Sequence, residues 1–318
     1  MTGTTRYVIR RVIQNLAILW LISIIAFTLM RLAPGGPAQF LDDPRMKKED
    51  IVRINESYGL SDPIPVQYGK WFSHVIQGDF GRSFINQRPV LDIIAERLPA
   101  TITLNIATII IGVLGIPMGI LMAVKRRSLF DKAMSIFNAV GNAAPHWWLG
   151  LLAIIFIAAP THWLPLGGMY TIGKENDILD RLWHLILPAT IAALGDWIFF
   201  SRYLRSSILE VIRLDYIRTA HAKGLHERLV LSRHAFRNAL IPLVPAFVGS
   251  VTGLIGGAVI FETVFSWPGI GRLAVQSTFN RDYPVVMALL MIGSLLTVIG
   301  FVIVDIVYTF VDPRVKYN

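Results

Sequence analysis

The stretch YPVVMALLMIGSLLTVIGFVIVDIVYTFV, Tyr283–Val311, carries a single charged residue, Asp305, among its 29 residues. A helix needs about 20 apolar residues to cross roughly 30 Å of hydrocarbon, and within lipid only helices and closed barrels satisfy all of their backbone groups. The stretch therefore predicts a transmembrane helix.

Five further windows have the same apolar, nearly uncharged character: residues 12–30, 100–124, 133–159, 182–201 and 239–261. Of all 318 residues 54% are hydrophobic and 16% are charged, whereas ordinary globular domains have about 25% charged residues. We therefore predict an all-α integral membrane protein with six transmembrane helices. Residues 12–30 exceed the apolar core of about 7 to 15 residues in a signal peptide, so we interpret them as a retained anchor. With no cysteine, disulfides and thiolate metal sites are excluded.

The distribution of Lys and Arg predicts the orientation in the membrane. Residues 202–237 hold eight basic and three acidic residues, and residues 1–11 and 125–132 are also basic. Residues 31–97, in contrast, hold nine charges of each sign. Basic segments remain on the cytoplasmic side, which predicts that both termini are cytoplasmic. This topology explains the net charge of +9 without a nucleic-acid partner.

The predicted topology divides the chain into five segments. They are a cytoplasmic arm at 1–11, a first span at 12–30, an external segment at 31–99, a five-span core at 100–311 with a cytoplasmic loop at 202–238, and a cytoplasmic tail at 312–318. The external segment is too long for a simple connection. Its residue pattern predicts two amphipathic helices lying at the surface, near residues 50–58 and 66–76.

The basic cytoplasmic loop contains DYIRTAHAKGLHERLVLSRHAFRNALIP, residues 215–242. Apolar residues interleave with its charges, which predicts two short amphipathic helices broken near Gly224. From charge alone, a solvated loop that only sets topology is an equal alternative. Ala220 and Gly224, followed by Ile241-Pro242, resemble the cytoplasmic EAA loop of ABC importer membrane subunits. The segment DYIRTAHAKGL is close to the form found in the dipeptide/oligopeptide permease family.

Further motifs extend this resemblance over nearly the whole chain. They are GLSDP at 59–63, GDFGRS at 78–83, RLPAT at 97–101, VFSWPGIG at 264–271, RDYP at 281–284 and DPR at 312–314. Together they resemble the B-type subunit of this permease family.

The resemblance implies a type I ABC importer permease fold in the bacterial or archaeal cytoplasmic (inner) membrane. It implies one half of a translocation path for di- or oligopeptides, which a solute-binding protein delivers. The implied partners are a C-type permease subunit, two ATPase subunits, the binding protein and membrane lipid, with no nucleic acid. No cofactor or metal is expected in this chain, because ATP and Mg²⁺ would bind the ATPase subunits.

The resemblance also implies roles for particular residues. The residues expected to couple to the ATPases are Asp215, Tyr216, Arg218, Thr219, Ala220, Ala222, Lys223, Gly224 and Leu225. Candidates for an external gate or for contact with the binding protein are Glu262, Phe265, Trp267 and Pro268.

Candidates for the translocation path come from the third and fourth apolar windows. They are Asn142, Pro145, His146, Trp147 and Trp148, together with Asp196. Trp residues normally collect at membrane interfaces, so a Trp pair in the middle of a span is unusual. Pro145 bends a helix by freeing a backbone carbonyl, and the segment aligns with the Ser-Ile-Pro-x-Phe segment of the family. Helix packing by these aromatic residues is an equal alternative.

Other functions are weighed against a peptide permease, and one of them is set aside. Residues 168–174 have the Gly and Lys spacing of a phosphate-binding loop, but Glu175 replaces the Ser or Thr that would hold Mg²⁺, so we predict a transport subunit and not an enzyme. Asp196 and Asp305 keep an ion-coupled carrier or an intramembrane enzyme open as weaker alternatives. Because aromatic faces stack on sugars, the Trp pair also keeps an oligosaccharide or another small solute open as cargo.

Two pairs of glycines have the four-residue spacing that lets helices approach closely. Gly115 and Gly119, and likewise Gly249 and Gly253, predict close helix packing.

Overall fold

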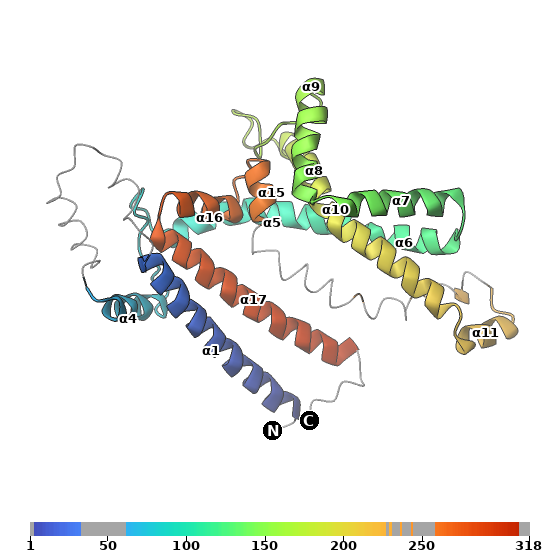
Figure 1. The fold of residues 1–318 in the computed structure, drawn as a ribbon, viewed down its shortest axis with the longest axis horizontal. Coiled ribbons are helices and arrows are strands. Elements are labelled where there is room, and N and C mark those ends of the chain that lie inside the picture. The colour runs from blue at the N-terminus through green and yellow to red at the C-terminus, as the bar shows by residue number, and fades with distance from the viewer. Residues whose placement is uncertain are drawn as a thin grey trace.

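The computed structural model describes residues 3–32, 62–226, 229–230, 236, 243 and 258–311. In this part of the chain the regular structure is helical (Figure 1), and the β-pairing is an isolated bridge between Arg82 and Pro89. The all-α prediction is confirmed.

Two long helices, α1 (Gly3–Leu32) and α17 (Tyr283–Val311), pack along each other (Figure 1), and both are apolar enough to span a membrane. The short helix α4 (Ile64–Val75) packs near the end of α1. The Phe27 ring of α1 lies 5.6 Å from Tyr68 and 5.4 Å from Trp71, both on α4. This confirms the second predicted amphipathic helix, and the first, near residues 50–58, lies outside the described residues.

The second span is longer than its apolar window predicts. It comprises α5 (Val90–Val113) and α6 (Gly115–Val124), which together form one candidate span. The helix begins at Val90, before the apolar window, because the apolar side chains of its first turns are buried although charged residues lie between them. Val90, Ile93 and Ile94 pack against Ile270 and Val285 in a buried cluster.

Residues 133–159, predicted as one span, fall in two helices that meet at 96°, and this bent pair is either one broken span or a re-entrant segment. The first is α7 (Leu129–Ala143); the second arm is α8 (His146–Ala153), the π-helix η1 (Ile154–Ala158) and α9 (Ala159–Thr161). Between them Ala144 is extended, at φ −122° and ψ 149°. Pro145 disfavours the helical conformation for the residue before it, so α7 ends there.

The longest helix is α10 (Ile178–Val211), which packs along α5 and α6. Its first turn is capped by the Asp177 carboxylate, which accepts from the backbone N–H groups of Leu179 and Asp180. A Cβ at Gly115 would lie 2.4 Å from the Trp197 carbonyl oxygen of α10. This confirms the close packing predicted there, while Gly249 and Gly253 lie outside the described residues.

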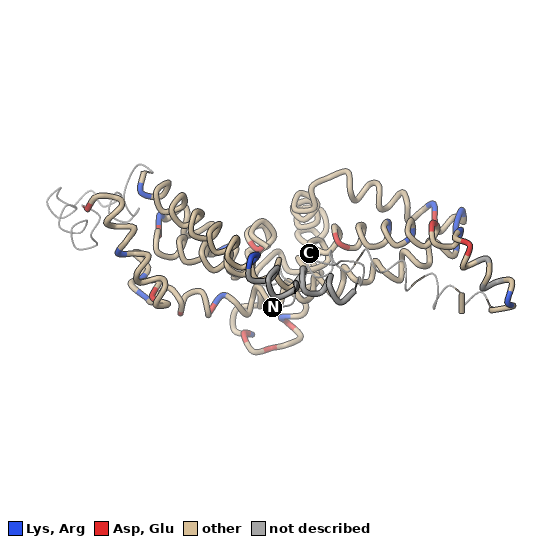
Figure 2. Tube along the Cα trace, turned by 90° about the horizontal axis from the view of Figure 1, so that it is seen from below, with Lys and Arg blue, Asp and Glu red and all other residues tan. Residues whose placement is uncertain are grey.

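The remaining described helices are α11 (Asp215–Ala222), α15 (Val259–Val264) and α16 (Ile270–Phe279). In the described part of the chain, four helices are long and apolar enough to span a membrane, or five if the bent pair is one span. The fifth window, 239–261, lies almost entirely outside it, so the count of six and the positions of the termini stay predictions. In Figure 2 the long helices are mostly uncharged, and charged residues concentrate near helix ends and in connections.

Candidate functional site

The carboxylate of Glu262 is the centre of a buried joint between α5, α15 and α16. Its side chain is 0% exposed. It accepts hydrogen bonds from the Thr101 hydroxyl at 2.7 Å and from the Arg272 backbone N–H at 3.0 Å. A Cβ on Gly269 would lie 2.5 Å from this carboxylate, and one on Gly271 would lie 3.0 Å from it. The two glycines of the VFSWPGIG motif therefore make room for the Glu262 side chain.

Trp267 and Phe265 extend the joint to the neighbouring helices. The Trp267 indole N–H donates to the Ala100 carbonyl at 2.8 Å. Phe265 packs against Ala153 and Leu187, on α8 and α10. Both aromatic side chains are buried, so they hold the short segment between α15 and α16 against three helices.

The four residues proposed to contact a binding protein are therefore mostly internal. The side chains of Glu262, Phe265 and Trp267 are buried, and Pro268 is partly exposed. In this structure the three buried side chains are not available for direct contact with another protein. A gating role for these three side chains stays a prediction. Thr101 belongs to the same buried joint, although it was not among the predicted site residues. The sequence offered one indication of Thr101, because this residue ends the RLPAT motif at 97–101.

The corner between α7 and α8 brings two of the proposed path residues together. His146, at the start of α8, lies 3.2 Å from the position of a Cβ on Gly195 of α10. The next residue, Asp196, is near enough for its charge to interact with His146. Trp147 and Trp148 are 39% and 45% exposed, so much of each ring faces away from this chain.

Asn142 lines a separate cavity of about 680 Å³ between α7 and α10. Ser135 of α7 shares this lining with Phe199, Arg202 and Tyr203 of α10, which sequence reasoning did not single out. The α10 residues recur at three- and four-residue spacing and so share a helix face. The cavity offers a cation, an aromatic pair and small polar groups to a ligand.

An ion pair between a buried carboxylate and a partly exposed arginine lies at the wall of this cavity. Asp131 of α7 is 3% exposed and accepts two hydrogen bonds from the Arg205 guanidinium of α10, at 2.7 and 2.9 Å. It also accepts from the Arg127 backbone N–H at 2.9 Å. Further along, the Asn138 amide donates to the Ser201 hydroxyl at 3.0 Å. These contacts fix the α7–α10 spacing on one side of the cavity.

The predicted coupling segment begins as α11, just beyond the end of α10 (Figure 1). Ile217 is buried against Ile208 and Val211, so this side chain anchors α11 to α10. Gly224 has φ +75°, which confirms the predicted break after this helix. The exposed residues are Asp215, Tyr216, Thr219, Ala222, Lys223 and Gly224. Leu225 packs against the same cluster as Ile217, and the side chains of Arg218 and Ala220 lie outside the described structure.

Comparison with known families identifies the system to which this chain contributes. Residues 115–317 match the binding-protein-dependent transport system inner membrane component, and residues 4–105 match the N-terminal family of the same membrane component. The chain belongs to this family. It is therefore a non-enzymatic permease subunit of an ABC importer and a multi-pass membrane protein.

Two curated relatives align with this permease along almost its entire length. The oligopeptide transport system permease protein AppB of Bacillus subtilis is 43% identical over 98% of this chain and 99% of its own. The probable peptide ABC transporter permease protein y4tP of Sinorhizobium fredii is 38% identical over 98% of this chain and 99% of its own. Among solved structures, an inward-facing MetNI methionine ABC transporter is 19% identical and covers 68% of this chain and 97% of its own, with a TM-score of 0.48.

Proposed function

We propose that this permease forms half of a translocation path for di- or oligopeptides that a solute-binding protein delivers. The observation that carries the cargo assignment is the agreement with AppB over 98% of the chain, because the external segment, the spans and the cytoplasmic loop are all included. Transport energy would come from ATP and Mg²⁺ bound by partner ATPase subunits.

The second half of the path would be a C-type permease subunit, and the complex would lie in a bacterial or archaeal cytoplasmic membrane. Two ATPase subunits would complete it, one of them contacting the segment 215–242. Ile136 and Val140 on α7 are 64% and 66% exposed in this chain, which is compatible with either lipid or a second membrane subunit on this face. Mass measurement of the complex purified with its operon neighbours tests this composition. A transport-active monomer or homodimer without ATPases would refute it.

The cavity between α7 and α10 would form part of the path. Asn142, Arg202 and Tyr203 give it hydrogen-bonding and charged groups in helices that are otherwise apolar. Such groups suit the carboxylates and amides of a peptide. His146 and Asp196 at the nearby corner would extend the same polar strip.

An oligosaccharide is the second candidate cargo, because Trp147 and Trp148 leave aromatic surface exposed at the α7–α8 corner. The test is mass spectrometry of the ligand that copurifies with the cognate binding protein, followed by uptake of that ligand into ATP-loaded vesicles. A peptide with strictly ATP-dependent uptake supports the proposal. A sugar would overturn the peptide assignment, and proton-driven uptake without ATP would overturn the importer mechanism.

A further inference from the structure

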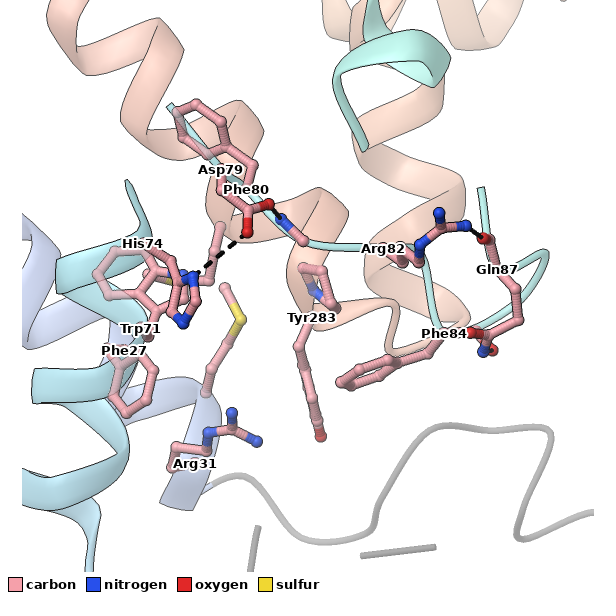
Figure 3. A pocket seen from close by; sticks show the side chains of 14 residues that line it. Phe27, Arg31, Trp71, His74, Asp79, Phe80, Arg82, Phe84, Gln87 and Tyr283 are labelled. Atoms are coloured by element: carbon pink, nitrogen blue, oxygen red, sulfur yellow. Dashed lines mark hydrogen bonds and ion pairs between the residues drawn. The ribbon is translucent and has the colours of Figure 1, made fainter. Parts of the chain in front are cut away.

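A pocket of about 360 Å³ lies where α1, α4, the loop at 79–87 and the start of α17 meet (Figure 3). Its volume falls within the range of about 300 to 1,000 Å³ that is usual for small-ligand sites. It is separate from the α7–α10 cavity and from the Glu262 joint, and the proposed transport function assigns it no role.

One wall of the pocket is apolar and comes from the two packed spans. Phe27 and Met30 of α1 face Pro284 and Met287 of α17 across it. Phe27 and Met287 are buried, and Trp71 of α4 lies against the Phe27 ring at 5.4 Å. This wall suits a hydrocarbon chain.

Cationic groups border the pocket beside this wall. The Arg31 guanidinium lies 5.0 Å from the ring centroid of Phe27 and 5.9 Å from that of Tyr283. In the described part of the chain, no carboxylate lies within ion-pair distance of Arg31. Arg82 donates to the Gln87 carbonyl at 2.8 Å and points away from Arg31, so Arg31 is the cation beside the apolar wall (Figure 3).

The single carboxylate of the pocket lining does not cancel this positive charge. Asp79 lies 3.3 Å from His74 Nδ1 and accepts from the Gly81 backbone N–H at 2.8 Å (Figure 3). The one acid of the lining therefore already has partners other than Arg31 and Arg82, which lie elsewhere on the pocket border. The lining favours an anion.

The residue types around the pocket are those found where a bilayer's headgroups meet its hydrocarbon. Arg31 is in the last turn of α1, and Tyr283 is the first residue of α17. Tyr, Trp and Arg at the ends of spans are typical of this interface. Phe27 and Met287 lie one turn further into their helices, so the apolar wall begins where the charged border ends.

We propose that this pocket binds an anionic phospholipid, with its phosphodiester at Arg31 and an acyl chain against Phe27, Met30 and Met287. A free phosphate would use Arg31 but leave the apolar side of the pocket empty, and an apolar molecule without charge would leave Arg31 without an anionic partner. The lipid would brace α1, α4 and α17 against one another at the external ends of the spans.

The test measures lipid binding to the intact complex by native mass spectrometry. The complex is exchanged into detergent and titrated with dioleoyl phosphatidylglycerol, dioleoyl phosphatidylcholine or glycerol 3-phosphate. We expect phosphatidylglycerol to bind most tightly. Arg31→Gln should weaken it about tenfold through loss of a charge-assisted contact, and Arg31→Lys should restore part of the affinity. Met287→Trp should reduce binding because the larger side chain fills the space beside the apolar wall.

Two substitutions serve as matched controls. Arg10→Gln removes an exposed arginine near the other end of α1, and Leu290→Trp adds an indole to an exposed position of α17. Both should retain the affinity of the unmodified complex. Equal binding of the two phospholipids, unchanged affinity in Arg31→Gln and Met287→Trp, or equal binding of glycerol 3-phosphate would each overturn the proposal. The measurement is independent of transport, so it stands apart from the cargo assignment.

Discussion

The side-chain hydroxyl of Thr101 donates a hydrogen bond of 2.7 Å to the carboxylate of Glu262, although 161 residues separate them in the chain. The same hydroxyl accepts from the Ile270 backbone N–H at 2.8 Å. Thr101 thus connects the carboxylate with the start of α16. Two motifs that the sequence shows only as separate signals meet at this one side chain.

Glu262→Ala is expected to destabilise the permease strongly. It would leave the Thr101 hydroxyl and the Arg272 N–H without their acceptor, and each unsatisfied buried group costs about 1–3 kcal/mol. Glu262→Gln keeps one acceptor oxygen and should lose less. The midpoint of thermal unfolding in detergent measures the effect, with Glu175→Gln in an exposed loop as the control. An unchanged midpoint for Glu262→Ala would contradict the joint.

Gly271→Ala is expected to lower the unfolding midpoint by steric conflict alone. Its Cβ would lie 2.6 Å from the Val259 Cα, so α15 and α16 would have to separate, and such overpacking costs about 1–3 kcal/mol. Gly69→Ala is the matched control, because a Cβ there meets nothing within 4 Å. In the helix α4 that change should stabilise by about 0.5–1 kcal/mol. Equal effects at the two positions would show that α15 and α16 are not in close contact.

Asp282 predicts a pH dependence of stability at the start of α17. Burial raises the pKa of the Asp282 carboxyl above its ordinary value of 3.8, against the hydrogen bonds from Ser83 and Phe84. The folded state then binds the proton more tightly than the unfolded state, so this group's contribution is complete below about pH 3.8 and is lost as pH rises through the raised pKa. Asp282→Asn should remove that dependence. Unfolding midpoints of the two proteins are measured from about pH 4 to pH 7, and the unmodified protein should lose stability relative to Asp282→Asn as the pH rises. A difference between the midpoints that does not change with pH would contradict this prediction.

Gly224→Pro tests the proposed coupling role of the segment 215–242. Proline fixes φ near −65°, so it cannot adopt the φ of +75° found at this position. We expect normal insertion and normal loading of the binding protein. Transport should be lost, together with either ATPase association or ATPase stimulation by the loaded binding protein. Gly173→Pro, at φ +87° in the loop before α10, should leave ATPase stimulation intact. Normal transport in Gly224→Pro would leave this loop as a signal for topology only.

The absence of cysteine allows a direct test of the path. Asn142→Cys and Tyr203→Cys should react with a membrane-impermeant maleimide in the complex, and bound cargo should slow the reaction. Leu114→Cys, a half-exposed apolar position on the second span, is the control and should react slowly at all times. Equal labelling at the three positions, or no protection by cargo, would exclude the α7–α10 cavity from the path.

In the part of the chain that the structure describes, the sequence predicted helices correctly where long apolar windows occur. It did not predict helix boundaries that are set by packing against distant parts of the chain. The start of α5 was missed because Asp92 and Glu96 interrupt the apolar run, while Val90 and Ile93 on the other face are buried by α16 and α17. A bend was expected at Pro145, but its angle of 96° depends on how α8 packs against α10, which periodicity does not contain.

The candidate site was predictable only in part for the same reason. Individual residues such as Asn142 and Glu262 could be nominated from motifs. Their partners could not, because Arg205 lies 74 residues after Asp131 and Thr101 lies far before Glu262. A single sequence gives no distance between such positions. The break at Gly224 was predictable because it is local.

The distance along the chain between Thr101 and Glu262 also sets an order of events during synthesis. At about 5–20 residues per second, roughly 10 to 30 s pass between the appearance of Thr101 and that of its acceptor. During this interval α5 enters the membrane without its later partners. Trp267, which donates to the Ala100 carbonyl, is made later still. A ribosome that stalls before residue 262 therefore leaves the Thr101 hydroxyl of the second span without its carboxylate acceptor.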